Sequence, residues 1–98
     1  MINIDEKDLR VIKKIIAEYI PAIEVRAFGS RLNGVCKPYS DLDLAVVGSK
    51  RIDSQIWIKL KDAFHESDLP FRVDIIDWHN ISDEFKNVVE KKYEVLTC

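Results

Sequence analysis

Cysteine is scarce in this sequence, and the two that occur, Cys36 and Cys98, lie far apart and outside any C-x-x-C pair. Zinc sites and disulfide scaffolds need more numerous or closely spaced cysteines, so neither is expected here. Reduced thiols are typical of cytosolic proteins, and a cytoplasmic location is therefore expected.

An excess of positive charge is also missing. The chain has 15 Lys and Arg against 17 Asp and Glu, a formal net charge of −2, and its basic residues are spread along the sequence. Proteins that coat duplex nucleic acid usually carry a basic patch, so direct duplex binding is not expected.

Long hydrophobic runs, internal repeats and low-complexity segments are absent as well. The first ten residues, MINIDEKDLR, already contain several charges, so neither a signal peptide nor a membrane span is expected. With 98 residues, 47% of them hydrophobic, the chain is expected to form one compact domain over residues 1–98.

The sequence does contain an alternation of helical and strand patterns. The spacing of apolar residues predicts helices over 5–20, 53–66 and 82–92, strands over 23–28, 42–47 and 71–77, and a helical turn or loop over 30–34. The expected fold class is therefore α/β, or α+β.

Two aspartates, Asp41 and Asp43, stand one residue apart at the start of the strand predicted over 42–47. Alternate residues of a strand share one face, so these carboxylates lie side by side. Two charges 4 Å apart repel by about 1 kcal/mol in bulk water and by about 4 kcal/mol at an effective dielectric of 20. A Mg²⁺ ion between them removes this penalty. The alternative is that the pair faces solvent at the sheet margin.

Gly29 and Ser30 follow the strand predicted over 23–28. The glycine lets a ligand approach the backbone, and the serine offers a hydroxyl and an N–H group at the start of a helical turn, where phosphates bind readily. The pair predicts a phosphate cradle, although most such dipeptides are only turns. A P-loop is excluded, because Val35 and Cys36 stand where Lys and Ser or Thr are needed.

A third acidic residue, Asp74, lies within the strand predicted over 71–77. If this strand neighbours the aspartate strand, Asp74 brings a third carboxylate to the same cation, and a two-metal site becomes feasible. Asp77 is the rival third acid, but it lies on the opposite strand face near the strand end. Its alternative role is to cap a turn or helix.

Other polar and aromatic residues have both a functional and a structural interpretation. Arg31 could neutralise a phosphate or could simply be solvated in a surface turn, and the same holds for the loop pair Lys50 and Arg51. His65 and His79 have no companion at metal-ligand spacing, so metal binding by them is not expected. Trp57 and Trp78 could belong to an interface or to the core.

The order and spacing of these motifs resemble the nucleotidyltransferase superfamily named for DNA polymerase beta. The motifs are Gly29-Ser30, then, after ten further residues, Asp41-Leu42-Asp43, and later Asp74. A chain this short looks like a minimal nucleotidyltransferase. The resemblance covers nearly the whole chain and is strongest from Phe28 to Trp78. It implies a small mixed β-sheet of three to four strands flanked by helices.

The resemblance also implies roles for individual residues. Asp41 and Asp43 would bind two Mg²⁺ ions, and Asp74 would complete one metal site and help to activate the attacking hydroxyl. Gly29, Ser30 and Arg31 would bind the nucleoside triphosphate, expected to be ATP, with Ser30 and the backbone amide after Gly29 holding its β- and γ-phosphates. Catalysis of this kind depends on positioning and charge neutralisation, which rigid strands support.

In this family the partner is commonly an all-helical HEPN protein, and the pair behaves as a toxin–antitoxin system. The precedent is adenylylation of a tyrosine of the partner, which silences its RNase activity. Unlike larger members, this chain has no extra helical domain to grip the acceptor, so recognition would depend on a partner in a homo- or hetero-oligomer. The alternatives are an antitoxin that neutralises its partner by contact alone and a nucleotide-sensing regulator. The nucleobase and the acceptor stay open.

Overall fold

A four-stranded mixed β-sheet forms the centre of the computed structural model, which describes residues 4–29, 31 and 40–96. The elements in chain order are α1 (Glu6–Tyr19), β1 (Glu24–Phe28), β2 (Leu42–Val47), α2 (Ser54–Glu66), β3 (Val73–Asp77), the short 3-10 helix η2 (Trp78–Asn80), α3 (Asp83–Lys91) and β4 (Glu94–Val95). The predicted turn at 30–34, apart from Arg31, and both cysteines lie outside the described residues.

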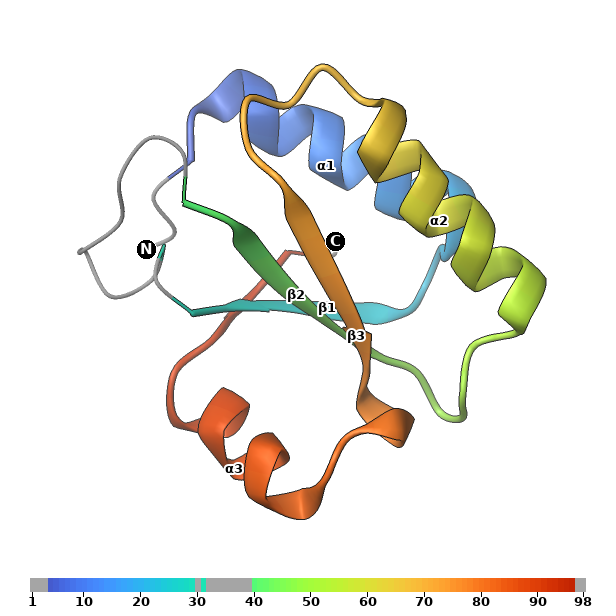
Figure 1. Cartoon of the computed structure of the whole chain (residues 1–98), viewed down its shortest axis with the longest axis vertical. Coiled ribbons are helices and arrows are strands. Elements are labelled where there is room, and N and C mark those ends of the chain that lie inside the picture. Colours follow the sequence, from blue (N-terminus) through green and yellow to red (C-terminus); the bar gives the residue numbers. More distant parts are fainter. Residues whose placement is uncertain (1–3, 30, 32–39, 97–98) are drawn as a thin grey trace.

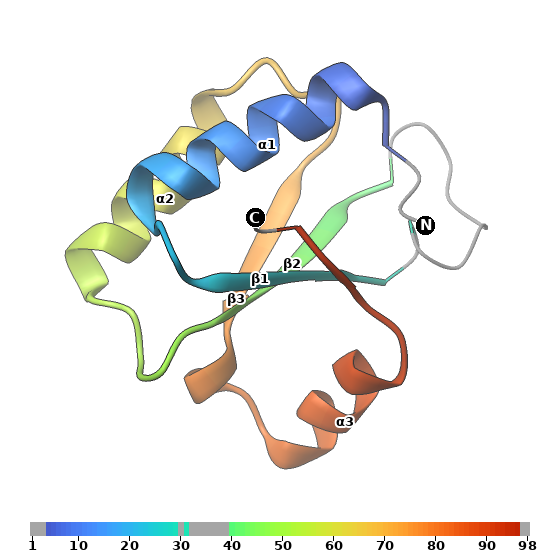
Figure 2. The same cartoon turned by 180° about the vertical axis from the view of Figure 1, so that it is seen from behind.

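The strand order in the sheet is β3-β2-β1-β4 (Figure 1). β1 runs antiparallel to β2 and to β4, whereas β2 and β3 are parallel. Parallel neighbours need a long crossover, and α2 supplies it. Seen from behind, the chain returns from α3 to pair beside β1 (Figure 2). The predicted mixed sheet is confirmed.

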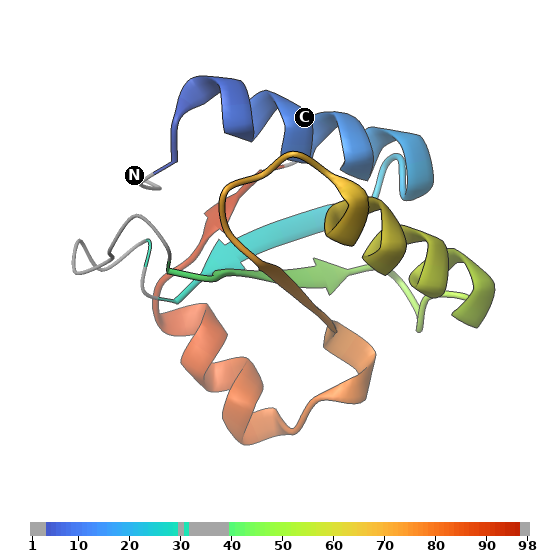
Figure 3. The ribbon, with the colours of Figure 1, turned by 45° about the horizontal axis from the view of Figure 1, so that its top comes forward.

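The helices cover both faces of the sheet (Figure 3), with α1 and α2 on one side and α3 on the other. The larger core lies under α1 and α2. It contains Ile12, Ile15, Ile16, Ile20, Val25, Ala27, Leu42, Leu44, Val46, Leu60, Phe64 and Leu96. A smaller cluster of Phe28, Ala45 and Val89 lies under α3. Each central strand is thus buried on both faces, except where α3 leaves one face uncovered.

The predicted helices agree with the observed ones to within about one residue at each end because their start signals are local. Asp53 caps α2 through a carboxylate oxygen that accepts the N–H groups of Gln55 and Ile56, and Ser82 caps α3 by accepting the N–H of Phe85. The strand predicted over 71–77 begins later, at Val73, and β4 and η2 were not predicted. Within the described residues, no helix is both long enough and apolar enough to cross a membrane.

Candidate active site

The parallel pairing of β2 and β3 places two of the predicted site residues directly beside each other. Asp43 and Asp74 are register partners on neighbouring strands, so they project from the same face. Asp41, two residues before Asp43, belongs to that face as well. The side chains of Asp41 and Asp74 are 41% and 46% exposed, and Asp43 is half-buried. All three stand where their strands begin, which is the margin of the sheet.

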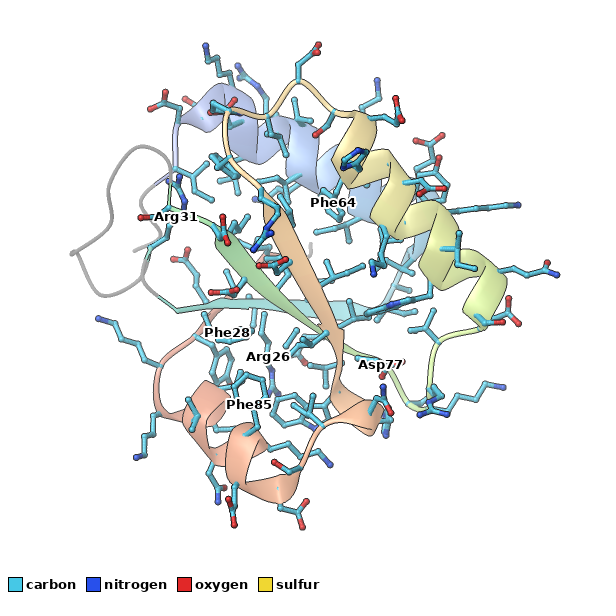
Figure 4. The ribbon with its side chains drawn as sticks, in the orientation of Figure 1. Arg26, Phe28, Arg31, Phe64, Asp77 and Phe85 are labelled. Atoms are coloured by element: carbon cyan, nitrogen blue, oxygen red, sulfur yellow. The ribbon has the colours of Figure 1, made fainter. Side chains whose placement is uncertain are left out.

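The same face becomes apolar one step further along the strands. Ala45 follows Asp43 on β2 and is fully buried. Phe28, the β1 register partner of Asp43, meets Phe85 of α3 edge to face with ring centroids 5.8 Å apart (Figure 4). α3 therefore covers the apolar part of this face and leaves the acidic margin open to ligands.

Gly29 lies directly against this acidic margin. Its φ of +91° belongs to the left-handed region, and a Cβ added there would lie 2.5 Å from Oδ2 of Asp43. Only glycine fits both the backbone angle and the space. The structure therefore explains why glycine stands here. Approach of a ligand to its backbone stays a prediction, and Ser30 lies outside the described residues.

Arg72 is a functional candidate that the sequence analysis missed. Its Nη2 atom donates to Oδ2 of Asp41 at 2.8 Å and to Oδ2 of Asp74 at 3.4 Å, while its side chain is 72% exposed. One signal in the sequence could have indicated it: a residue two positions before Asp74 shares the face of Asp74 if the strand continues in that direction.

The acidic cluster remains under-neutralised despite this arginine. Burial raises the pKa of Asp43 above its ordinary value, and the negative charges of Asp74 and Asp41 raise it further. Arg72 only partly opposes this effect. The pKa of Arg72 is itself raised, first by its hydrogen bond to Asp41 and then by the charges of Asp41 and Asp74. A further cation would therefore be favourable at this margin.

The convergence of three carboxylates on a metal stays a prediction. The structure sets Asp43 beside Asp74 and joins Asp41 to Asp74 through one nitrogen of Arg72. Among residues 4–29, 31 and 40–96, no three His, Cys, Asp or Glu side chains are gathered closely enough to hold a metal ion. The donors nevertheless fit Mg²⁺ in type and charge, because carboxylate oxygens are its preferred protein ligands.

Arg31 is buried, with only 5% of its surface exposed, so the alternative of a solvated turn residue is wrong. Its Nε donates to the carbonyl oxygen of Ser40 at 3.0 Å, and its guanidinium carbon lies 4.1 Å from the ring centroid of Phe71. The arginine therefore links the segment that follows β1 to the segment that precedes β2. Its contact with a phosphate stays a prediction.

Asp77, the rival third acid, is a structural residue. It is 8% exposed and lies at the far end of β3 (Figure 4). Its Oδ2 accepts the backbone N–H of Ile52 at 2.8 Å, and its Oδ1 accepts that of His79 at 2.9 Å, at the start of η2. The capping interpretation of Asp77 is confirmed.

Four of the remaining candidates, Arg51, Trp57, Trp78 and His79, make structural contacts. Nε2 of His79 lies 2.7 Å from the carbonyl oxygen of Gly48, and Arg51 donates to the side-chain oxygen of Asn80. Trp57 packs against the larger core and Trp78 against the smaller one, so both tryptophans are half-buried.

An open pocket of about 530 Å³ adjoins the acidic margin on the side of α2. Phe64 and His65 of α2 line it together with Phe71, Arg72 and Asp74. It is large enough for part of a nucleotide or for an acceptor side chain.

The chain belongs to the family described as "Polymerase beta, Nucleotidyltransferase", which it matches over residues 10–98. It is 42% identical over 95 residues to the protein named "Probable protein adenylyltransferase MntA" of Haemophilus influenzae, covering 97% of this chain and 83% of that protein. The resemblance to nucleotidyltransferases found in the sequence is thereby confirmed.

Several solved structures share the fold, including two toxin–antitoxin structures. A toxin–antitoxin crystal structure with AMP-PNP superposes with a TM-score of 0.74 at 26% identity, covering 91% of this chain and 72% of the other. The second is a tri-AMPylated Shewanella oneidensis HEPN toxin in complex with MNT antitoxin, with a TM-score of 0.68 at 24% identity over 93% of this chain and 70% of the other. The predicted nucleotidyltransferase-like fold is confirmed.

Proposed function

We propose that this protein is a Mg²⁺-dependent nucleotidyltransferase that transfers AMP from ATP to an all-helical HEPN partner and acts as its antitoxin. One observation carries the proposal: Asp43 and Asp74 lie side by side at an open sheet margin, against the backbone of Gly29. The relative is named a protein adenylyltransferase, and the two structural neighbours are a toxin–antitoxin with AMP-PNP and an AMPylated HEPN toxin with its antitoxin. These names support the choice of AMP and of the partner.

Asp41, Asp43 and Asp74 would hold the metal, and two ions fit the family's chemistry better than one. When bound, Mg²⁺ neutralises phosphate charge and polarises the phosphorus that is attacked. The strands hold the carboxylates in place, so little reorganisation is needed when substrate arrives. Gly29 gives the triphosphate access to backbone N–H groups, and Ser30 and Arg31 would hold its β- and γ-phosphates.

In the transfer step, an acceptor hydroxyl oxygen forms a bond to the α-phosphorus of ATP. The bond from that phosphorus to the oxygen bridging to the β-phosphate breaks, and pyrophosphate leaves with the electron pair. Asp74 would take the hydroxyl proton, because a partly exposed carboxylate at the pocket can reach an incoming side chain. The acceptor would enter from the pocket beside α2.

The proposal is tested by the intact mass of the HEPN partner after co-expression or incubation with ATP and Mg²⁺. Addition of AMP with the wild type, and its loss with the double variant Asp41→Asn/Asp43→Asn, is the expected result. Asp83→Asn is the matched control, because that side chain is 99% exposed on α3. If the double variant still neutralises its partner and the partner mass never changes, the protein acts by contact and the catalytic proposal is wrong.

A further inference from the structure

Arg72 makes an arrangement at the acidic margin that the proposed reaction does not by itself require. A single nitrogen, Nη2, lies 2.8 Å from Oδ2 of Asp41 and 3.4 Å from Oδ2 of Asp74. These carboxylates come from neighbouring parts of the sheet, one just before β2 and one within β3. The guanidinium therefore occupies the position between two predicted metal ligands.

We propose that Arg72 is the resident counter-ion of this site, holding Asp41 and Asp74 together until a divalent cation displaces it. The inference rests on the proposed function, because it takes these carboxylates as metal ligands. Arg72 is accordingly a positioning residue: it acts on the metal site through the carboxylates.

The contacts of Arg72 with the carboxylates are weak enough for a metal ion to displace it. Its side chain is 72% exposed, and exposed ion pairs shift equilibria by only about two- to fivefold. Arg72 pairs with Asp41 and Asp74 while Asp43 lies beside Asp74, so the margin keeps a net negative charge and attracts a cation. A divalent ion brings twice the charge to the same oxygens.

The structure also provides space for the displaced side chain. Arg72 lines the pocket of about 530 Å³ beside α2, together with Phe64, Phe71 and Asp74. A guanidinium that leaves the carboxylates can turn into this pocket. Displacement therefore needs only rotation of an exposed side chain and no movement of the strands.

The test measures binding of Mn²⁺ alone, a substitute for Mg²⁺ that also prefers oxygen ligands, from the free-ion signal in electron paramagnetic resonance. Arg72→Gln should tighten Mn²⁺ binding about two- to fivefold, because the competitor is gone. Arg72→Lys keeps the charge and should bind Mn²⁺ nearly as the wild type does. Arg10→Gln is the matched control: its side chain is also 72% exposed and ion-paired, but it lies on α1.

A second readout separates competition from a merely structural role. Without metal, Arg72→Gln should lower the urea midpoint of unfolding, since Asp41 and Asp74 lose their cation. In saturating Mg²⁺ the midpoints of variant and wild type should coincide. A structural role would lower the midpoint equally in both conditions and would overturn the proposal.

The outcomes also distinguish this inference from the proposed function. If the wild type binds Mn²⁺ and Arg72→Gln binds it equally well or more weakly, that result overturns the counter-ion role but leaves the metal site standing. If neither protein binds Mn²⁺, or if Asp41→Asn/Asp43→Asn binds it as well as the wild type, both the counter-ion role and the metal site are wrong.

Discussion

The two ends of β3 carry an acidic residue each, and the two carboxylates have opposite surroundings. Asp77 is buried, and backbone N–H groups of Ile52 and His79 occupy both of its oxygens. Asp74 is 46% exposed, lies beside another carboxylate, and has one arginine contact at 3.4 Å. A carboxylate bound by backbone amides stabilises the fold, whereas one paired with an exposed side chain remains available for ligand.

The same contrast holds along β2. Leu42, Leu44 and Val46 are buried under α1 and α2, where they can only stabilise the core. Asp43 lies on the other face, where α3 no longer covers the sheet. The proposed site thus lies at the margin that α3 leaves open, and the core beneath it keeps the strands in register.

The largest effect that would break the comparison is expected at Asp74. Asp74→Asn should lower the rate of AMP transfer by at least about a hundredfold, because a proposed metal ligand and proton acceptor is lost. Its stability should change little, since the side chain is partly exposed. The measurement is the rate of AMP incorporation into the HEPN partner, alongside urea unfolding. Retention of the wild-type rate would remove Asp74 from the site.

The next largest effect is expected at Asp77, at the other end of β3, where stability rather than AMP transfer should be lost. Asp77→Ala should lower the free energy of unfolding by about 1–3 kcal/mol, because two backbone N–H groups lose their acceptor. The fraction of variant that is folded should transfer AMP normally. Urea unfolding measures the loss, and Asp83→Ala, at a 99% exposed side chain, is the control. Loss of transfer by fully folded Asp77→Ala would assign Asp77 to the site as well.

Gly29 tests whether the close approach of backbone to the margin matters. Gly29→Ala should lower the free energy of unfolding by about 1–2 kcal/mol and slow AMP transfer, because a Cβ would meet Oδ2 of Asp43 at 2.5 Å in a left-handed backbone. Gly48→Ala is the matched control, since its nearest contact is 3.2 Å and its φ carries no such strain. Equal losses in the two variants would argue against a special role for Gly29.

Local patterns in the sequence are enough to predict most of this architecture. The caps at Asp53 and Ser82 involve neighbours within three residues, and strand alternation places Asp41 and Asp43 on one face without any knowledge of the sheet. The preference for Asp74 over Asp77 rests on its more central place in the predicted strand. The structure makes Asp77 a capping residue, and the site role of Asp74 stays a prediction.

What could not be predicted depends on pairs that are distant in the chain. The burial of Arg31 requires Phe71, forty residues away, and the bridge from Arg72 to Asp41 requires the parallel register of β2 and β3. β4 has only two residues and forms because β1 is beside it, so no local periodicity marks it. Long-range contacts thus decide the side-chain pairing of the site.

The smallest effect sharpens the comparison through pH. The pKa of Asp43 is raised in the folded protein, by burial first and then by Asp74 and Asp41, so the native state binds a proton more tightly than the unfolded chain does. The contribution of Asp43 to stability without metal should therefore fall as pH rises from below about 4 through the raised pKa. Asp43→Asn lacks this titration and should be more stable than the wild type at pH 7, by about 1 kcal/mol or less.

Urea unfolding in metal-free buffer between pH 3 and pH 7 measures this difference, which should shrink toward acid pH. Adding Mg²⁺ at pH 7 should reverse the order, because only the wild type gains a bound cation at this carboxylate. Asp77→Asn provides the contrast within the same sheet: its loss of stability should persist in Mg²⁺, since its partners are backbone amides. If the stability difference between Asp43→Asn and the wild type changes with neither pH nor Mg²⁺, then Asp43, like Asp77, is structural.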